Sequence, residues 1–340
     1  MTGTPTSSRA AAYSPAVRLA RLAAAIVAMA CAGATSYVHA QPFPARPIRF
    51  IVPFTPGGSQ DVIARLLGQK LTERLGQQFV VDNRAGAAGL IAAEATARAP
   101  ADGYTILMAT AGPVTIAPSL HRRLPYDPAR DFAPVIHLVD TPMALIASNA
   151  LPARTVAELV TLVKAKPGGL NYASTGNGSI SHLTMELFKI RTGAQLVHVP
   201  YKGAAPALVD LIAGQVPLLF TTTASAQPHA AAGKVRAIAV AAKRRSAMMP
   251  DVPTMEESGV KDFEVPVWAG VLTTAGTPRP VVEKLYREFQ SALQEKGVQD
   301  RLTQLGSDIA DEGPAQFAAL LKADIARWAQ VVKVANIKLD

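Results

Sequence analysis

The chain has 340 residues, of which 49% are hydrophobic, and its formal net charge is +9. This length is sufficient for two domains of ordinary size. The basic residues are scattered apart from the run at 243–245, and only 6% of the residues are aromatic, so a basic, aromatic-rich surface of the kind that binds nucleic acid is not predicted. The positive charge is expected to lie on a solvated surface.

Residues 1–40 show the pattern of an export signal. Three arginines precede an apolar stretch at 22–33, and the small residues Val38 and Ala40 stand at the −3 and −1 positions of a signal-peptidase site. The stretch is too short to span a bilayer comfortably, although an uncleaved membrane anchor is the alternative. Cys31 is the single cysteine, so a chain cleaved after Ala40 would have no thiol for a disulfide, a nucleophile or a metal site. We predict this cleavage and a periplasmic location.

Strand patterns and helix patterns alternate along the rest of the chain. Short apolar runs predict strands at 48–52, 79–81, 105–109, 171–173, 196–199, 216–220 and 235–241. Apolar residues at helical spacing, with capping residues at several ends, predict helices near 62–71, 90–99, 155–166, 180–190, 204–213, 278–297 and 314–334. This alternation predicts parallel sheets covered by helices.

Two further apolar segments, 135–147 and 265–272, have the character of crossovers between domains. If both bridge the same gap, residues 43–142 and 265–340 form one domain and residues 143–264 form the other. The two crossover strands would act as the hinge. A ligand would then lie between the domains, near the carboxyl ends of the strands.

The first of two glycine-rich turns is PFTPGGSQD at 53–61. Gly57 and Gly58 permit unusual backbone angles, Ser59 is a good N-cap for the next helix, and Asp61 complements the dipole of that helix. Because the backbone N–H groups at a helix start are unpaired, they make a ready site for an anion. The alternative is a capped turn that binds nothing.

The second turn, STGNGSISHL at 174–183, is the stronger signal. It has three hydroxyl groups, and Gly176 and Gly178 allow the backbone to approach a ligand closely, while Ser179 can cap the next helix. Such a loop can hold a carboxylate without an arginine. His182, one helical turn further on, is either a packed core histidine or a ligand contact.

No catalytic or cofactor motif is complete. A nucleophile elbow around Ser179 would require glycines where Asn177 and Ser181 stand, and the dinucleotide and phosphate-loop patterns also fail. No histidine pair has the spacing of a zinc-binding helix. We therefore predict no catalytic residue, no metal and no cofactor. Asp61 with His182 is the one titratable pair that a hydrolase or isomerase could use.

Several motifs follow one another along nearly all of the chain beyond the export signal: RPIRFIVPFTPGGSQD (46–61), VVDNRAGAAG (80–89), ADGYTILMAT (101–110), YDPARDFAPV (126–135), STGNGSISHL, HVPYKGAAPALVDLIAGQV (198–216) and AGTPRPVVEKL (275–285). In this combination the chain resembles the tripartite tricarboxylate transporter receptors, also called Bug-type solute-binding proteins. The resemblance implies an α/β, two-domain periplasmic-binding-protein (flytrap) fold, type II-like. Each domain would be a mixed, mostly parallel sheet flanked by helices.

The resemblance also implies which residues contact a ligand carboxylate. They are Phe54, Gly58 and Ser59 on one wall, Thr175, Gly176, Gly178 and Ser179 on the other, and Thr110, Tyr201, Thr221 and Trp268 at the floor, the sides and the hinge. Tyr201 could equally pack against the domain core. The residues at 221–223 are three threonines where the family often has an Asp-Asn pair, which argues against an amino-acid ligand. The segment 111–119 also departs from the family pattern, so contacts from it are left open.

These features predict an extracytoplasmic receptor that binds a small organic anion, a carboxylate, and delivers it to the subunits of a membrane transporter. We expect a monomer that closes reversibly around its ligand and requires no cofactor. One alternative is a receptor that docks on a membrane sensor kinase when its ligand is bound. Another is a periplasmic hydrolase or isomerase.

Overall fold

The computed structural model describes residues 43–338 and, outside this range, Ala16. The apolar stretch of the predicted export signal, its cleavage site after Ala40, and Cys31 lie outside the described residues. In the part that is described, no helix is both long and apolar enough to cross a membrane.

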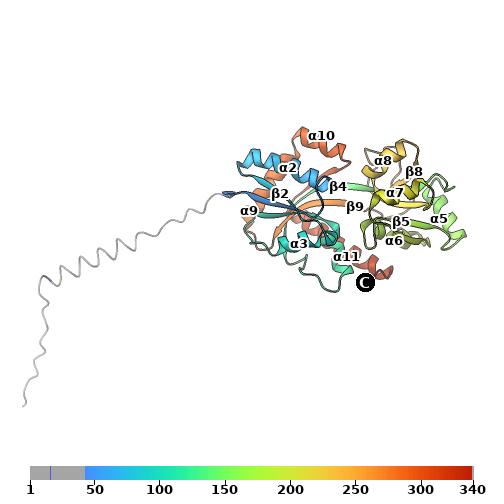
Figure 1. Ribbon diagram of the computed structural model, residues 1–340, viewed down its shortest axis with the longest axis horizontal. Helices are drawn as coiled ribbons and strands as arrows, with labels where there is room; N and C mark the ends of the chain where they lie inside the picture. The colour runs from blue at the N-terminus through green and yellow to red at the C-terminus, as the bar shows by residue number, and fades with distance from the viewer. Residues whose placement is uncertain (1–15, 17–42, 339–340) are drawn as a thin grey trace, which may run out of the picture. The chain divides into compact units, whose positions relative to one another are not determined.

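Strands from both ends of the chain form the first of two lobes (Figure 1). Its strands are β1 (Ile48–Val52), β2 (Phe79–Asn83), β3 (Thr105–Thr110), β9 (Pro266–Thr274), β10 (Asp308–Glu312) and the first part of β4 (Phe132–Ser148). β1 pairs in parallel with β2 and β3, whereas β9 pairs antiparallel with β3 and β4. The helices of this lobe are α2 (Ser59–Leu75), α3 (Leu90–Ala97), α4 (Ala117–Leu120), α9 (Arg279–Leu293), α10 (Lys296–Gln304) and α11 (Pro314–Val334).

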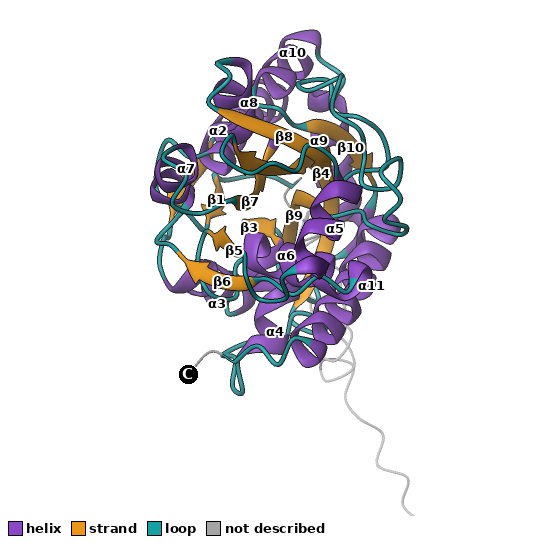
Figure 2. Ribbon diagram, turned by 90° about the vertical axis from the view of Figure 1, so that its right-hand side faces the viewer, coloured by secondary structure: helices purple, strands orange, loops and turns teal. Residues whose placement is uncertain are grey.

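The middle of the chain forms the second lobe. The end of β4 pairs antiparallel with β7 (Leu218–Thr222) and β8 (Val235–Val240), and parallel pairs then join β7 to β5 (Asn171–Ser174) and β5 to β6 (Val197–Pro200). The helices here are α5 (Val156–Ala165), α6 (Ile180–Thr192), α7 (Ala204–Ile212) and α8 (Thr223–Ala231). Figure 2 shows the strands in the interior with the helices around them. The predicted α/β class, with mixed sheets flanked by helices, is confirmed, but the sheets are less parallel than predicted because β4 and β9 run antiparallel to each of the strands they pair with.

Two long strands, β4 and β9, run between the lobes (Figure 1), and they overlap the apolar segments 135–147 and 265–272. They pair antiparallel from Phe132 and Thr274 down to Pro142 and Pro266. From Met143 onward, β4 pairs with β7 and β8 instead. A single uninterrupted strand therefore belongs to the sheet of each lobe in turn.

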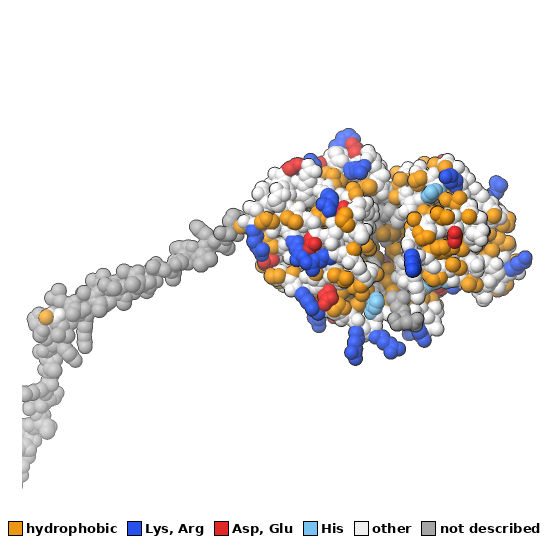
Figure 3. Space-filling view, viewed as in Figure 1, with side chains coloured by type: hydrophobic (Ala, Val, Ile, Leu, Met, Phe, Trp, Pro, Cys, Tyr) orange, Lys and Arg blue, Asp and Glu red, His pale blue; other side chains and the backbone are white. Residues whose placement is uncertain are grey.

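Several elements differ from the prediction. The helix expected at 278–297 ends at Leu293, and α10 begins separately at Lys296. The segment after β3 is helical, with a π-helical turn η2 (Gly112–Ile116) that continues into α4, and a short 3-10 turn η1 (Ala87–Gly89) precedes α3. Neither these turns nor α8 and β10 had a clear local pattern. On the face shown in Figure 3, the Lys and Arg side chains are scattered and do not form one basic patch.

Candidate functional site

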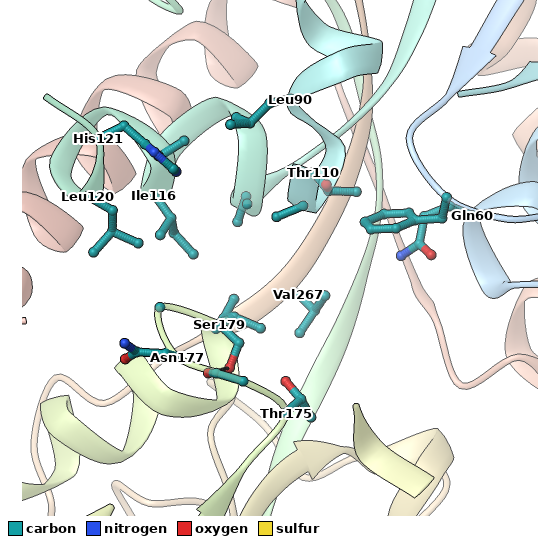
Figure 4. Close-up of a pocket in the computed structure, with 18 residues that line it drawn as sticks. Gln60, Leu90, Thr110, Ile116, Leu120, His121, Thr175, Asn177, Ser179 and Val267 are labelled. Carbon is teal, nitrogen blue, oxygen red and sulfur yellow. Dashed lines mark hydrogen bonds between the residues drawn. The ribbon is translucent and has the colours of Figure 1, made fainter. Parts of the chain in front are cut away.

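A cavity of about 410 Å³ lies where the two lobes meet β9. The first lobe contributes Phe54, Thr110 and the segment around η2 and α4, and the second contributes the glycine-rich loop at 175–180. Val267 of β9 also lines it. Figure 4 shows these side chains converging on one space. Of the residues predicted to bind a ligand, the cavity brings together Phe54, Thr110, Thr175, Gly176, Gly178 and Ser179.

The side chain of Asp61 holds the turn before α2 in place by hydrogen bonds. The buried Asp61 carboxylate accepts hydrogen bonds from the Gly57 backbone N–H (2.9 Å) and from the Asn83 amide (2.8 Å), and it forms an ion pair with Arg65. Burial alone would raise the pKa of Asp61, but these bonds outweigh it and lower the pKa to about 2. Asn83 also donates to the Phe54 carbonyl (3.0 Å), which holds Phe54 at the cavity.

Gly58 and Ser59 are not among the cavity-lining residues, contrary to the predicted wall. Gly58 is the N-cap residue of α2, and its helix start has no side-chain cap, so the expected capping role of Ser59 is also wrong. The Ser59 hydroxyl instead donates to the Gln60 side chain (3.0 Å). Gln60 is the residue of this turn that reaches the cavity beside Phe54 (Figure 4).

The glycine-rich loop before α6 has many internal hydrogen bonds. The Ser179 hydroxyl accepts from the His182 backbone N–H (3.2 Å), which confirms the predicted cap, and it donates to the Gly176 carbonyl (2.7 Å). The Gly178 N–H donates to the His182 ring nitrogen Nδ1 (3.1 Å), and the Gly176 N–H donates to the Ser174 hydroxyl (3.2 Å). The loop hydroxyl and N–H groups were expected to face a ligand, but several of them form hydrogen bonds within the loop instead.

The rings of His182, His198 and Tyr172 stack on one another beside this loop. His182 lies 3.8 Å from His198, which lies 5.0 Å from Tyr172, in ring-centroid distances, and His198 hydrogen-bonds the Ser174 hydroxyl (2.6 Å). Burial lowers the pKa of both histidines to about 4, with a further lowering by Lys189 and, for His198, by His182. His182 is therefore a packed, neutral core histidine. It bonds Gly178 and not Asp61, so the candidate catalytic pair shares no hydrogen bond in the structure.

We expect this stack to make the protein less stable in mild acid. Above pH 6.5, His182 is neutral in both the folded and the unfolded chain. Between pH 6.5 and about 4, only the unfolded chain takes up the proton, so the free energy of unfolding falls as the pH falls, by about 3 kcal/mol over this range and by about 2 kcal/mol down to pH 5.0 for this residue. Urea unfolding at pH 7.5 and 5.0 measures the difference.

The matched variants are H182N and H229Q. Asparagine keeps an oxygen that can accept from Gly178 but does not titrate in this range, so H182N should lose clearly less stability between pH 7.5 and 5.0 than the wild type. H229Q changes a histidine of α8 outside the stack and should follow the wild type. Equal losses in all three proteins would contradict the assignment of this acid sensitivity to the stack.

Three further predicted residues lie away from the cavity lining, in addition to Gly58 and Ser59. Tyr201 packs against the core of the second lobe, and its hydroxyl donates to Asp210 (2.7 Å). Thr221 is buried within β7, opposite Ala144 of β4. Trp268 does not cover the cleft. It is buried because its ring packs on Phe317 and its Nε1 donates to the Asp324 carboxylate (3.0 Å).

Asp324 connects two walls of the cavity from within the core. Its carboxylate oxygen accepts from the Thr115 hydroxyl of η2 (2.6 Å) as well as from Trp268. Thr115 is next to the lining residue Ile116, and Trp268 is next to the lining residue Val267. A buried carboxylate of α11 therefore links η2 to the connecting strand β9.

The prediction missed most of one wall. Its residues come from η1, the start of α3, η2 and α4, and include Ala88, Leu90, Ile116, Leu120 and His121. The motif VVDNRAGAAG contains η1, but nothing in it indicated that Ala87 and Ala88 adopt positive φ angles (45° and 53°) that direct Ala88 to the cavity. Gln60, Asn177 and Val267 were missed as well, although each is adjacent to or one residue away from a predicted residue.

Comparison with known proteins agrees with this geometry. Residues 63–337 match the family model described as "Tripartite tricarboxylate transporter family receptor". The chain is 39% identical to the protein BugT of Bordetella pertussis over 95% of this chain and 100% of that protein.

Solved structures show the same relationship. The chain is 38% identical to Rpa4515 of R. palustris with adipate (TM-score 0.75; 87% of this chain, 99% of that one) and 35% identical to MatC of Rhodopseudomonas palustris with bound malate (TM-score 0.72; 85% and 100%). It is 38% identical to the periplasmic binding protein BugD (TM-score 0.72; 87% and 99%). The extended match, the shared fold and the cavity between two lobes lead to one conclusion: the chain belongs to the tripartite tricarboxylate transporter receptor family.

Proposed function

We propose that the protein is an extracytoplasmic receptor that binds a small organic carboxylate in the cavity between its lobes and delivers it to the membrane subunits of a tripartite tricarboxylate-type transporter. The family supplies the receptor role. Relatives with bound adipate and malate indicate the class of ligand. The observation that carries the proposal for this chain is the side chain of Thr110.

Thr110 ends β3 and lines the cavity, yet it is only 5% exposed. Among the described residues, no group forms a hydrogen bond with its hydroxyl. A buried polar group without a partner is costly, so a hydroxyl held in this way at a cavity is poised for a bound molecule. Figure 4 shows Thr110 near Gln60, with Thr175 on the opposite wall across the gap from Thr110.

These groups can hold a carboxylate without a cationic side chain. The Thr110 hydroxyl and the Gln60 amide lie on the first lobe, and Thr175 with the start of α6 lies on the second. Hydroxyl and amide donors form strong hydrogen bonds to an ionised acceptor, and the positive end of the α6 dipole adds about 0.3–1 kcal/mol. One carboxylate would thus contact both lobes.

The two lobes would serve as the moving domains. We assign residues 43–142 and 265–340 to one domain and residues 143–264 to the other, with β4 and β9 as the hinge. The location of the cavity beside these strands supports this division. Closure about the hinge would bring the loop at 175–180 toward Thr110 and enclose the ligand.

The cellular location is part of the same proposal. We infer export to the periplasm with cleavage after Ala40, because residues 1–40 have the composition of an export signal and BugD is a periplasmic binding protein. Since the family role is reception and not catalysis, we propose that ligand binding is reversible and leaves the ligand unchanged.

A matched pair of threonine variants tests the site. T110V should weaken binding of the tightest ligand in a panel of mono-, di- and tricarboxylates by about 1–3 kcal/mol, since one hydrogen bond to an ionised group is lost. Its stability should stay within about 0.5 kcal/mol of the wild type, because no intramolecular bond is removed. Calorimetric titration and thermal melting measure the two quantities.

The control is T223V. Thr223 is also buried with a hydroxyl that lacks a partner among the described residues, but it starts α8 and does not line the cavity. T223V should therefore bind as the wild type does. If T110V and T223V bound equally well, Thr110 would not be a ligand contact. If no carboxylate in the panel bound or stabilised the wild type, the proposed function itself would fail.

A further inference from the structure

The two lobes also touch each other away from the cavity. Gly306, between α10 and β10 of the first lobe, packs against Ala224 and Met248 of the second lobe. This approach leaves no room for a side chain on the glycine, because a Cβ atom at Gly306 would stand 3.0 Å from the Ala224 Cβ and closer still to the Met248 Sδ. The next residue, Ser307, shares a hydrogen bond with Thr141 of β4 (3.0 Å), so the contact is tied to a connecting strand.

This contact lies across the connecting strands from the cavity. Asp140 of β4 pairs with Trp268 of β9 along one edge and with Asp308 of β10 along the other, and Val267 of β9 lines the cavity. Figures 1 and 2 both show α8 and α10 on one side of β4 and β9, with α3 and α6, whose first residues line the cavity, on the other side. A rotation about these strands that separates the cavity walls therefore presses α8 and the end of α10 together.

Beside β10 there is open space for such a rotation. A second cavity, of about 340 Å³, lies there, and both lobes line it: Asp308 and Ile309 come from the first lobe, and Lys243 and Arg244 from the second. The lobes are thus apart at this point and already in close contact at Gly306. Further opening of the binding cavity would have to overcome the contact at Gly306 first.

We propose, building on the receptor function above, that the contact of Gly306 with Ala224 and Met248 is the stop that limits opening of the binding cavity. A ligand held by the closed form has an apparent dissociation constant that rises as the closed fraction of the protein falls. The bulk of the side chains at this contact therefore sets the affinity of the receptor for every ligand, although none of the three residues lines the cavity.

Ala224 and Met248 allow this bulk to be changed in both directions. A224L enlarges the contact, so it should disfavour the open form and tighten the binding of adipate and of malate by the same factor, about threefold or more. M248A empties space, allows wider opening and should weaken the binding of both by a similar factor. In the double variant A224L/M248A the leucine can occupy the emptied space, and both affinities should return to within about twofold of the wild type.

The control is A231L, which adds the same side chain at the exposed last residue of α8 and should bind as the wild type does. Gly306 itself stays unchanged, because its φ angle of +70° would add backbone strain to any side chain placed there. Calorimetric titration with adipate and malate at pH 7.5 measures the affinities, and thermal melting checks that each variant is folded.

A second measurement needs no ligand. R123C and K202C place spin labels at two exposed positions, one on each lobe, and C31S removes the single native thiol. Electron–electron double resonance then reports the distance between the labels. In the ligand-free protein, A224L should increase the population with the shorter distance, whereas A231L should leave the distribution as it is in the wild type.

Three outcomes would overturn the inference and leave the receptor function intact. They are a label distribution in A224L equal to that in A231L, equal affinities of these two variants, and a change of affinity that differs between adipate and malate, since the last would indicate an altered ligand contact and not an altered equilibrium. If the wild type bound neither adipate nor malate, the proposed function would be weakened, and the label distances would still decide this inference.

Discussion

Replacing Asp324 by alanine is expected to lower the free energy of unfolding by about 1–3 kcal/mol. The Asp324 carboxylate is buried, and one of its oxygens accepts hydrogen bonds from both Thr115 and Trp268. Removal of the carboxylate leaves the buried Trp268 Nε1–H without an acceptor, which costs about 1–3 kcal/mol, whereas the Thr115 hydroxyl can still donate to the Ala111 carbonyl (3.1 Å). Urea unfolding followed by far-ultraviolet circular dichroism gives the free energy directly.

Two further variants separate this effect from the loss of a surface charge. D324N keeps a carbonyl oxygen that can accept from both donors, so it should lose less stability than D324A. D300A removes an exposed carboxylate of α10 that pairs with Lys296 and should cost less than about 1 kcal/mol. A D324A protein as stable as D300A would show that the link between η2 and β9 does not hold the structure together.

Gly178→Val should weaken carboxylate binding by about a hundredfold or more. Gly178 has a φ angle of +71°, a conformation that a β-branched residue adopts only with strain of about 1–2 kcal/mol. Valine would therefore force the loop out of its present course and break the bond from the Gly178 N–H to His182. Because the loop lines the cavity, both the shape of this wall and the backbone approach to the ligand would change.

Gly233→Val provides the matched control. Gly233 follows α8 with a φ angle of +65°, and a side chain added there meets no atom within 4 Å. G233V should show a similar loss of stability but bind the same carboxylate with unchanged affinity. If G178V bound as tightly as G233V, the second wall of the site would have been placed wrongly.

The parts of the site that were predictable are those determined by local chemistry. The cap of α6 depends on a serine three residues before the amide it accepts from, and the turn at 174–179 needs glycine where φ is positive, so both features are visible in a short stretch of sequence. The apolar segments at 135–147 and 265–272 were also visible in the sequence, the first as two apolar runs separated by Asp140, Thr141 and Pro142.

The remaining parts depend on competition between residues or on distant contacts. Ser59 and Asp61 both suit the start of α2, and only the folded structure shows that Asp61 takes up the Gly57 amide while Ser59 stays at the surface. Trp268 has the size and position of a cleft residue, but a carboxylate 56 positions away in the sequence holds it in the core. The wall made by η2 and α4 follows from tertiary packing of a segment that contains Pro113 and Pro118, which obscure any helical pattern.

The register of the connecting strands has a mechanical consequence. Pro142 of β4 and Pro266 of β9 are register partners, and neither has an N–H group to donate across the ladder. Torsion of the two strands at this point therefore sacrifices no hydrogen bond between these partners. If the two domains move about this point, the strands bend without losing a hydrogen bond between these two residues, and the populations of the open and closed conformers then follow the difference in the ligand's affinity for each of them.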